Sequence, residues 1–285
     1  MPWKHPAISA LLPTLVAALL WSGGAGAEDY TLCNQGLKAK AAGDNALAIN
    51  LIGMCIDHGK LRSPALAVAL YQRGEAHRRL GALDKALQDF SAALRIKTDM
   101  TEAYSGRAVA FAQSGKHGLA ILDYERALRL EPGSANLHYN RALSHIGNGA
   151  FEQALRDLDR VLELDPKFVG AVDYNRGVVL ARLRLYDEAI KAFDASIQGR
   201  WDLAVAYLDR ALLFLRNRRY QPAVADLGNV LVLKPNFGDA FAYRGLAREG
   251  LGDGAGAAGD YRRALEFGTT LDWVPRRLAP LQSKG

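Results

Sequence analysis

Hydrophobic residues recur at a helical spacing along most of this chain. The stretch from residue 83 to 96 shows the pattern. Polar residues separate apolar residues that recur every three or four positions, namely Ala86, Leu87, Phe90, Ala93 and Leu94. Steps of three and four residues place these side chains on one face of an amphipathic helix. Similar stretches follow one another, separated by short segments that contain glycine or proline, which end helices. The pattern therefore predicts an all-α chain of consecutive amphipathic helices.

A second regularity is a recurring pair, arginine followed by glycine or alanine. The pairs are Arg73-Gly74, Arg107-Ala108, Arg141-Ala142, Arg176-Gly177, Arg210-Ala211 and Arg244-Gly245, and successive pairs are 34, 34, 35, 34 and 34 residues apart. We number each repeat from 1 to 34 and place the glycine or alanine of the pair at position 8. Position 20, which did not set this register, is alanine in all seven copies: Ala48, Ala86, Ala120, Ala154, Ala189, Ala223 and Ala257.

The small residues have a physical role. Two antiparallel helices joined by a tight turn must approach closely to pack, and small residues at positions 8, 20 and 27 permit this. Glycine at position 15 follows the first helix in five copies, and proline at position 32 follows the second helix at Pro132, Pro166 and Pro235. The period and residue types together resemble the tetratricopeptide repeat. The resemblance implies an α-solenoid of about seven helix-turn-helix hairpins, wound into a right-handed superhelix.

The register divides the chain into three parts. The solenoid is expected at 29–271, after an N-terminal segment and before a tail at 272–285 that forms at most a short cap. The repeats are 29–62, 67–100, 101–134, 135–168, 170–203, 204–237 and 238–271, with residues 63–66 and 169 as insertions. One hairpin cannot bury its apolar face alone, so stacked hairpins are expected to share a continuous core.

The N-terminal segment, 1–27, has the composition of a secretory signal peptide. A short basic start precedes an apolar run, and Ala25-Gly26-Ala27 matches the small-residue cleavage pattern. We expect cleavage before Glu28 and a periplasmic or secreted mature protein. The alternative is an uncleaved anchor, although the apolar run is short for a membrane span. No membrane span is expected after signal cleavage.

The chain has two cysteines, Cys33 and Cys55, at positions 5 and 27 of the first repeat. These positions lie on the two antiparallel helices at similar heights. In an exported chain this arrangement predicts a disulfide, which requires Cα atoms within about 7 Å. The alternative is a pair of buried thiols.

Arginine at position 7 tends to occur together with aspartate at position 23. The aspartates are Asp89, Asp123, Asp157, Asp226 and Asp260, whereas repeat 1 has neither residue and repeat 5 has Arg176 with Ala192. The pattern indicates ion pairs between helices, because a buried charge is costly without a partner. The partner lies either in the same hairpin or in the next one. The alternative is an arginine ladder that grips a ligand.

In proteins with this repeat, the first helix of each hairpin lines a concave face through positions 2, 5, 6, 9, 12 and 13. The resemblance places a candidate partner-binding groove at Tyr71, Glu75, Arg78, Arg79, Tyr139, Asn140, Tyr174, Asn175, Arg182, Asp209, Arg216 and Tyr243. The Tyr-Asn pair occurs in two successive repeats. Tyrosine offers apolar area with a polar tip, and asparagine can bond an extended backbone from both sides. We predict a short track for a peptide or protein partner, with a merely wet inner wall as the alternative.

Catalytic chemistry has little support in the sequence. The chain lacks His-Glu-x-x-His, Gly-x-Ser-x-Gly, phosphate-loop and clustered Cys/His patterns, so we expect no enzyme activity, cofactor or metal. His138, His145 and His77 lie at positions where other repeats carry aromatic rings, and we interpret them as packed rings rather than ligands. The net charge of +6 comes from 36 basic and 30 acidic residues mixed along the chain, which argues against a nucleic-acid partner.

One group of arginines is concentrated at or beside the turns of repeats 5 and 6: Arg182, Arg184, Arg216, Arg218 and Arg219. Stacked repeats would bring these turns onto one edge, where an acidic partner or an anionic envelope surface can dock. Solvated turn charges are the alternative.

These features predict an exported interaction scaffold that binds a peptide or protein partner in its groove. The alternative function is a structural assembly factor that docks to an acidic partner or envelope surface through the basic edge. A third class, an enzyme or the helper half of one, would need converging titratable groups around a pocket, and the sequence shows none.

Overall fold

The computed structural model describes residues 30–58 and 61–282, and these residues confirm the all-α fold class, with helices throughout and no strand among them. The chain divides into two compact units, one ending at Leu164 and the other beginning at Asp165. The predicted signal peptide, residues 1–27, lies outside the described residues. Among the described helices, none has both the length and the apolar character that a membrane crossing needs.

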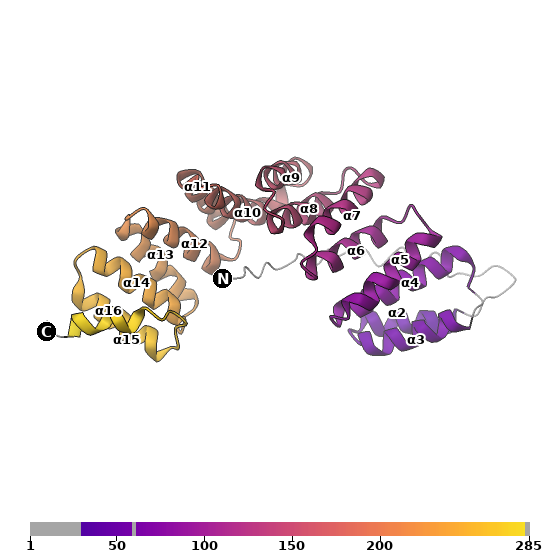
Figure 1. Cartoon of the computed structure of the whole chain (residues 1–285), viewed down its shortest axis with the longest axis horizontal. Helices are drawn as coiled ribbons and strands as arrows, with labels where there is room; N and C mark the ends of the chain where they lie inside the picture. Colours follow the sequence, from indigo (N-terminus) through magenta and orange to yellow (C-terminus); the bar gives the residue numbers. More distant parts are fainter. Residues whose placement is uncertain (1–29, 59–60, 283–285) are drawn as a thin grey trace. The chain divides into compact units, whose positions relative to one another are not determined.

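The described residues of the first unit form four helical hairpins (Figure 1). They are α2 (Thr31–Ala41) with α3 (Asn45–Asp57), α4 (Ser63–Arg79) with α5 (Leu83–Ile96), α6 (Thr101–Gln113) with α7 (His117–Leu130), and α8 (Ala135–Gly147) with α9 (Phe151–Leu164). The predicted insertion before the second repeat is part of α4, which begins at Ser63. Pro64 fits there because proline is tolerated in the first turn of a helix.

The second unit contains three hairpins and a final helix. A short 3-10 turn, η1 (Pro166–Phe168), leads into α10 (Val169–Arg182) and α11 (Tyr186–Gln198), then α12 (Leu203–Arg216) and α13 (Tyr220–Leu233), α14 (Gly238–Gly250) and α15 (Gly254–Glu266), and α16 (Val274–Gln282). Helix α16 packs on α15 and buries Val274 and Leu278. The tail thus forms a nine-residue capping helix that covers apolar surface of the last hairpin.

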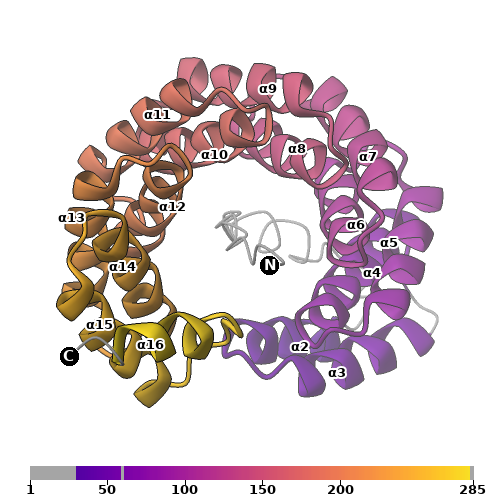
Figure 2. The same ribbon diagram turned by 60° about the vertical axis from the view of Figure 1, so that its left-hand side comes forward.

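Within each unit, hairpins stack because a second helix also packs against the first helix of the following hairpin, as α3 does on α4 and α13 does on α14. Figure 2 shows that, within each unit, the first helices lie on the inner side and the second helices on the outer side. We call the side of the first helices that faces away from the second helices the inner face. The predicted groove positions belong to these first helices.

The core follows the predicted register. The alanines at position 20 are 0% exposed in all seven hairpins: Ala48, Ala86, Ala120, Ala154, Ala189, Ala223 and Ala257. The large residues at position 24, among them Phe90, Leu158 and Tyr261, are also fully buried. The small residues therefore let paired helices approach while the large ones fill the space between them.

Helix ends also follow the sequence. Asp44, Ser134 and Asp253 cap the N-termini of α3, α8 and α15 by accepting a hydrogen bond from a backbone N–H group. The position-15 glycines adopt positive φ angles of 72° to 87°, which end the first helices of five hairpins. Helices α7, α9 and α13 each end two residues before a proline.

Candidate functional site

The inner face of the first unit carries a group of polar side chains on α2 and α4, four of which form two hydrogen-bonded pairs. Lys40 on α2 donates a hydrogen bond from Nζ to Oε1 of Gln72 on α4, which links two hairpins. Further along α4, Arg78 donates from Nε and Nη2 to both carboxylate oxygens of Glu75, at 3.0 and 2.9 Å. Arg79, the next residue, is exposed. We call these five residues the inner polar cluster.

Electrostatics tune the lysine of the inner polar cluster. Burial lowers the pKa of Lys40 to about 8, the Glu75 carboxylate opposes this shift, and the Arg79 and Arg78 guanidiniums add to it. An anionic group of a bound partner would favour the charged lysine. Burial, followed by the charge of Glu75, raises the pKa of Tyr71, so this side chain is a neutral phenol at physiological pH.

The inner face of the second unit is organised around a buried carboxyl group. The Tyr174 hydroxyl on α10 donates a 2.8 Å hydrogen bond to Oδ2 of Asp209 on α12. Asp209 is 7% exposed, and burial raises its pKa to about 7, although the hydrogen bond from Tyr174 acts in the opposite direction. Asn175 donates from Nδ2 to the Ala171 carbonyl oxygen at 2.9 Å. The Tyr174–Asp209 bond connects the first helices of two hairpins, whereas the Asn175 bond lies within α10.

The structure corrects the predicted Tyr-Asn track. Tyr139, Tyr174 and Asn175 are only 2%, 6% and 2% exposed, and Asn140 alone is partly exposed. The Tyr174 ring packs 5.8 Å from the Phe193 ring, centroid to centroid, because the helices approach closely enough to enclose it. The prediction that these side chains present their polar groups to a peptide is therefore wrong at three of the four positions.

The other predicted groove residues have varied exposure. Tyr71, Glu75, Arg78 and Tyr243 are partly buried, and Asp209 is buried; Arg79, Arg182 and Arg216 are exposed. Helix α4 brings Tyr71, Glu75, Arg78 and Arg79 together. Lys40 and Gln72 were missed, although they occupy groove positions 12 and 6, and the repeat numbering contained the signal that would have found them.

The recurring arginines and aspartates form ion pairs within single hairpins. In five hairpins the arginine Nε and Nη2 atoms bind both aspartate oxygens at 2.6 to 2.9 Å: Arg73–Asp89, Arg107–Asp123, Arg141–Asp157, Arg210–Asp226 and Arg244–Asp260. The aspartates are 3% to 6% exposed. These guanidiniums are occupied by their own hairpins, which favours the structural interpretation over a ladder that grips a ligand.

Some of these arginines also reach the preceding hairpin. Arg107 donates from Nη1 to the Ser91 hydroxyl at 3.1 Å, and Arg210 donates from Nη1 to Asp194, which occupies the same repeat position as Ser91. One guanidinium thus joins the two helices of its own hairpin and the hairpin before it.

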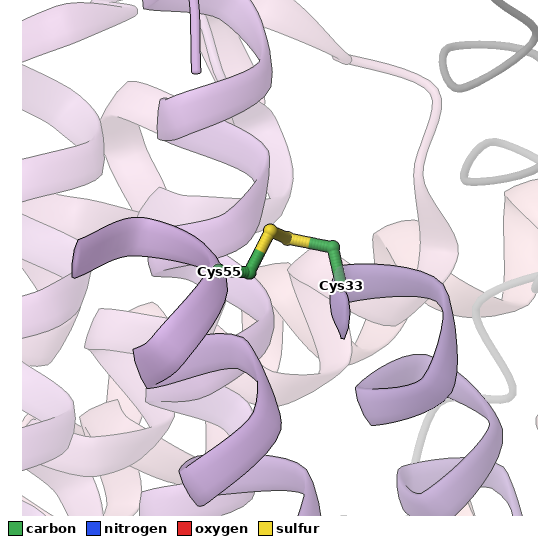
Figure 3. The surroundings of a disulfide bond; sticks show 2 residues. All are labelled: Cys33 and Cys55. Carbon is green, nitrogen blue, oxygen red and sulfur yellow. A yellow bond between two sulfur atoms is a disulfide. The ribbon is translucent and has the colours of Figure 1, made fainter. Parts of the chain in front are cut away.

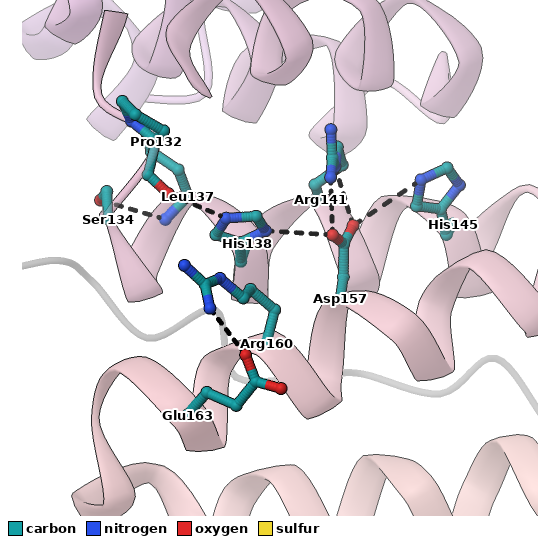
Figure 4. Close-up of polar contacts among 9 residues, drawn as sticks. All are labelled: Pro132, Ser134, Leu137, His138, Arg141, His145, Asp157, Arg160 and Glu163. Atoms are coloured by element: carbon teal, nitrogen blue, oxygen red, sulfur yellow. Dashed lines mark hydrogen bonds and ion pairs between the residues drawn. The ribbon is translucent and has the colours of Figure 1, made fainter. Parts of the chain in front are cut away.

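The histidines contact the same aspartates. Around Asp157, Figure 4 shows Arg141 between His138 and His145. The His138 Nδ1 atom is 3.1 Å and the His145 Nε2 atom 3.8 Å from the carboxylate oxygens. Burial lowers the pKa of His145, against the attraction of Asp157. The rings are 13% and 12% exposed, in agreement with packed rings, and their contact with position 23 was not predicted.

No group of three His, Cys, Asp or Glu side chains is placed to hold a metal ion within residues 30–58 and 61–282.

The predicted disulfide is present: Cys33 on α2 and Cys55 on α3 are bonded, with Cα atoms 5.4 Å apart (Figure 3). The bond connects the two helices of the first hairpin.

The five arginines of the predicted basic edge, which we keep under that name, are all exposed: Arg182, Arg184, Arg216, Arg218 and Arg219. The two turns that carry them are neighbours, because the Arg216 guanidinium lies 4.9 Å from the Tyr186 ring centroid and Arg219 Nη1 lies 3.9 Å from Asp187. Arg184 and Arg218 have φ angles of 64° and 56°. Such left-handed backbone costs a residue with a Cβ atom about 1 kcal/mol relative to glycine.

Known proteins share this architecture. The chain is 37% identical over 82 residues to RNA polymerase II-associated protein 3 of Xenopus tropicalis, a match that covers 29% of this chain and 12% of that protein. A tetratricopeptide repeat protein of Parabacteroides merdae has a crystal structure with a TM-score of 0.66 and 22% identity, covering 88% of this chain and 97% of that one. The C-terminal part of a TPR repeat-containing protein of Cytophaga hutchinsonii has a TM-score of 0.69 and 16% identity, covering 86% and 98%.

Family models for this repeat match most of the described hairpins. Tetratricopeptide repeat models match residues 67–100, 139–204 and 208–270, and a TPR repeat model matches 110–149, together more than half of the chain. The small-residue register and the hairpins match the same architecture. The chain therefore belongs to the tetratricopeptide repeat family, whose repeats form protein–protein interaction scaffolds.

Proposed function

We propose that this chain is an exported scaffold that holds a peptide segment of a protein partner against the inner polar cluster, and that it acts by binding rather than by catalysis. The observation that carries this proposal is the link from Lys40 to Gln72, which joins two hairpins into one polar surface on the inner face. The second helices pack behind this surface and leave it as the side available to a partner (Figure 2).

The chemistry of the cluster suits a peptide. Lys40, Arg78 and Arg79 are donors, and Gln72 and Glu75 supply acceptors, so backbone carbonyl groups, amides and acidic side chains of a partner all find complementary groups. The Lys40–Gln72 and Arg78–Glu75 hydrogen bonds hold four of these five side chains in place before binding. Pre-ordered side chains lose less conformational entropy when a partner arrives, which strengthens binding.

Export is supported by two independent features. The N-terminal segment has the charge, apolar run and cleavage pattern of a signal peptide. The Cys33–Cys55 disulfide is a bond that persists in oxidising compartments and is rare in the cytosol. N-terminal sequencing of the mature protein, expected to begin at Glu28, tests this part of the proposal.

Two triple variants of equal composition test the binding surface. Lys40→Ala/Gln72→Ala/Arg79→Ala removes one Lys, one Gln and one Arg from the inner face. Lys85→Ala/Gln88→Ala/Arg95→Ala removes the same residue types from exposed positions on α5. Mature wild-type protein serves to capture and identify a partner from an envelope extract, and the affinity of the purified partner is then measured for all three proteins.

We expect the inner-face variant to bind the partner at least about tenfold more weakly than wild type, because it removes several contacts at the centre of the interface. The α5 variant should bind like wild type. Equal affinity for the two variants, at unchanged helical content, would show that the partner does not use the inner polar cluster.

A further inference from the structure

Two hairpin turns of the second unit differ from the turns of the other described hairpins at repeat position 15. At position 15, five hairpins have glycine with positive φ, whereas the fifth and sixth hairpins have Arg184 and Arg218 in the same backbone conformation. Glycine adopts this conformation without steric cost and arginine does not. Strained residues persist mainly where they serve a function, so the two arginines call for an explanation beyond turn formation.

The surroundings of the two arginines favour an external ligand. The backbone N–H groups of Arg184 and Arg218 close their turns, but neither guanidinium has an ion-pair or hydrogen-bond partner among the described residues, and both side chains are exposed. The remaining members of the basic edge flank them on the same two turns. Every cation there is arginine, whose planar fork binds a carboxylate through two parallel hydrogen bonds. The chain itself uses that geometry in five buried Arg–Asp pairs, such as Arg73–Asp89.

The charge pattern favours a peptide over a lipid surface. Asp187 and Glu188 are exposed in the first turn of α11, directly after the turn that carries Arg184, and Asp187 lies 3.9 Å from Arg219. A continuous anionic bilayer would approach these carboxylates as well as the arginines, and repulsion would weaken docking. A flexible segment with separated carboxylates can reach each arginine and avoid the two acidic side chains.

We propose that the basic edge is a second interaction surface, distinct from the inner polar cluster, and that it docks a segment rich in Asp and Glu from a partner protein. Arg184 and Arg218 are its central residues, and arginine replaces glycine in these two turns because it adds a carboxylate-binding fork at the cost of a strained backbone.

The test measures binding of a fluorescent ten-residue polyglutamate peptide at low salt. The main variant is Arg184→Gly/Arg218→Gly, which removes both guanidiniums and restores the residue found in the other five hairpins. Arg184→Lys/Arg218→Lys keeps the charge without the fork. The matched control is Arg95→Gln/Arg129→Gln, a pair of exposed arginines at equivalent positions of the second and third repeats. Vesicles of phosphatidylglycerol and phosphatidylcholine form a separate arm.

The glycine variant is expected to bind the peptide about fivefold more weakly, the lysine variant to fall between it and wild type, and the control to match wild type. The glycine variant should melt no lower than wild type, because the strain is relieved. Equal binding by wild type and both edge variants would overturn the proposal, as would an equal loss in the control. Binding to vesicles without binding to polyglutamate would also overturn it and would identify a lipid surface instead. The Lys40→Ala/Gln72→Ala/Arg79→Ala variant should retain the peptide, which separates this surface from the inner polar cluster.

Discussion

Arg73 and Asp89 lie sixteen residues apart on the two helices of one hairpin, and Arg73 binds both oxygens of the Asp89 carboxylate at 2.9 and 2.7 Å. The same relationship, with the same separation, recurs in four more hairpins. The aspartate is nearly enclosed and the arginine only partly so, with side-chain exposures of 8% and 24% in this pair. A pair of this kind is costly to break from one side, because an enclosed charge then remains without a partner.

This asymmetry predicts the effect of Arg107→Met. The variant leaves Asp123, which is 3% exposed, without its bidentate partner, and we expect it to lower the free energy of unfolding by about 3 kcal/mol. Arg107→Met/Asp123→Leu should recover most of this loss, since no charge is left buried. Urea denaturation followed by circular dichroism measures both variants.

Arg160→Met is the control for this experiment. Arg160 also binds a carboxylate, Glu163, at 2.6 Å, but the two side chains are 48% and 63% exposed. An exposed pair contributes about 0.5 kcal/mol or less. If Arg107→Met were no more destabilising than Arg160→Met, the buried pairs would not stabilise the hairpins in the way described.

Close helix approach predicts opposite effects for two glycine-to-alanine changes. A Cβ atom at Gly245 on α14 would lie 2.6 Å from a ring carbon of Tyr261, whereas nothing lies within 4 Å of a Cβ atom at Gly259 on α15. Gly245→Ala should destabilise the protein by about 2 kcal/mol through overpacking. Gly259→Ala should stabilise it by about 0.5 to 1 kcal/mol, because alanine favours helix. Thermal denaturation gives the signs, and two changes of the same sign would contradict the assigned helix contacts.

The repeat register was sufficient to predict much of this fold. Alanine at position 20 and glycine or alanine at position 8 identify the surfaces where paired helices meet, because no larger side chain fits there. The register also identified which residues form the ion pairs. It did not decide whether the aspartate partner of each arginine lies in the same hairpin or in the next one. Repeat numbering allows both, because it does not give the distances between the helices.

The candidate site was harder to predict for a related reason. Repeat numbering assigns Tyr139 and Tyr174 to the inner face, but their exposure depends on how closely successive first helices approach. That distance is set by many side chains together and not by any single position. The numbering places Lys40 at a groove position, but its importance comes from contact with Gln72 in the next hairpin, which the numbering of a single repeat does not show.

The buried carboxyl of Asp209 predicts a pH dependence of stability. Burial raises its pKa from 3.8 to about 7, so the folded state holds a proton that the unfolded state releases. Protonated Asp209 therefore contributes to the free energy of unfolding. This contribution is complete below about pH 4 and is lost as the pH rises to about 7, by up to about 1.4 kcal/mol per pH unit. Asp209→Asn keeps an acceptor for the Tyr174 hydroxyl and does not titrate. Its stability relative to wild type should therefore increase between pH 4 and 8.

Chemical denaturation at several pH values across this range measures the difference. Asp187→Asn, which removes a carboxylate whose side chain is 83% exposed, should leave the pH profile of wild type unchanged. Parallel profiles for wild type and Asp209→Asn would mean that Asp209 titrates normally and that its hydrogen bond to Tyr174 dominates over burial.

The disulfide predicts a local loss of stability on reduction. Cys33 and Cys55 are 1% and 3% exposed and close a loop of 22 residues, so the cross-link restricts the unfolded chain and stabilises the first hairpin by about 3 kcal/mol. Cys33→Ala/Cys55→Ala should increase amide hydrogen exchange in α2 and α3 far more than in α12 and α13. Reduced wild type, which keeps both side chains, separates loss of the cross-link from loss of packing. Denatured, unreduced protein should not react with a thiol reagent, and detection of two reactive thiols would show that the cysteines are not bonded.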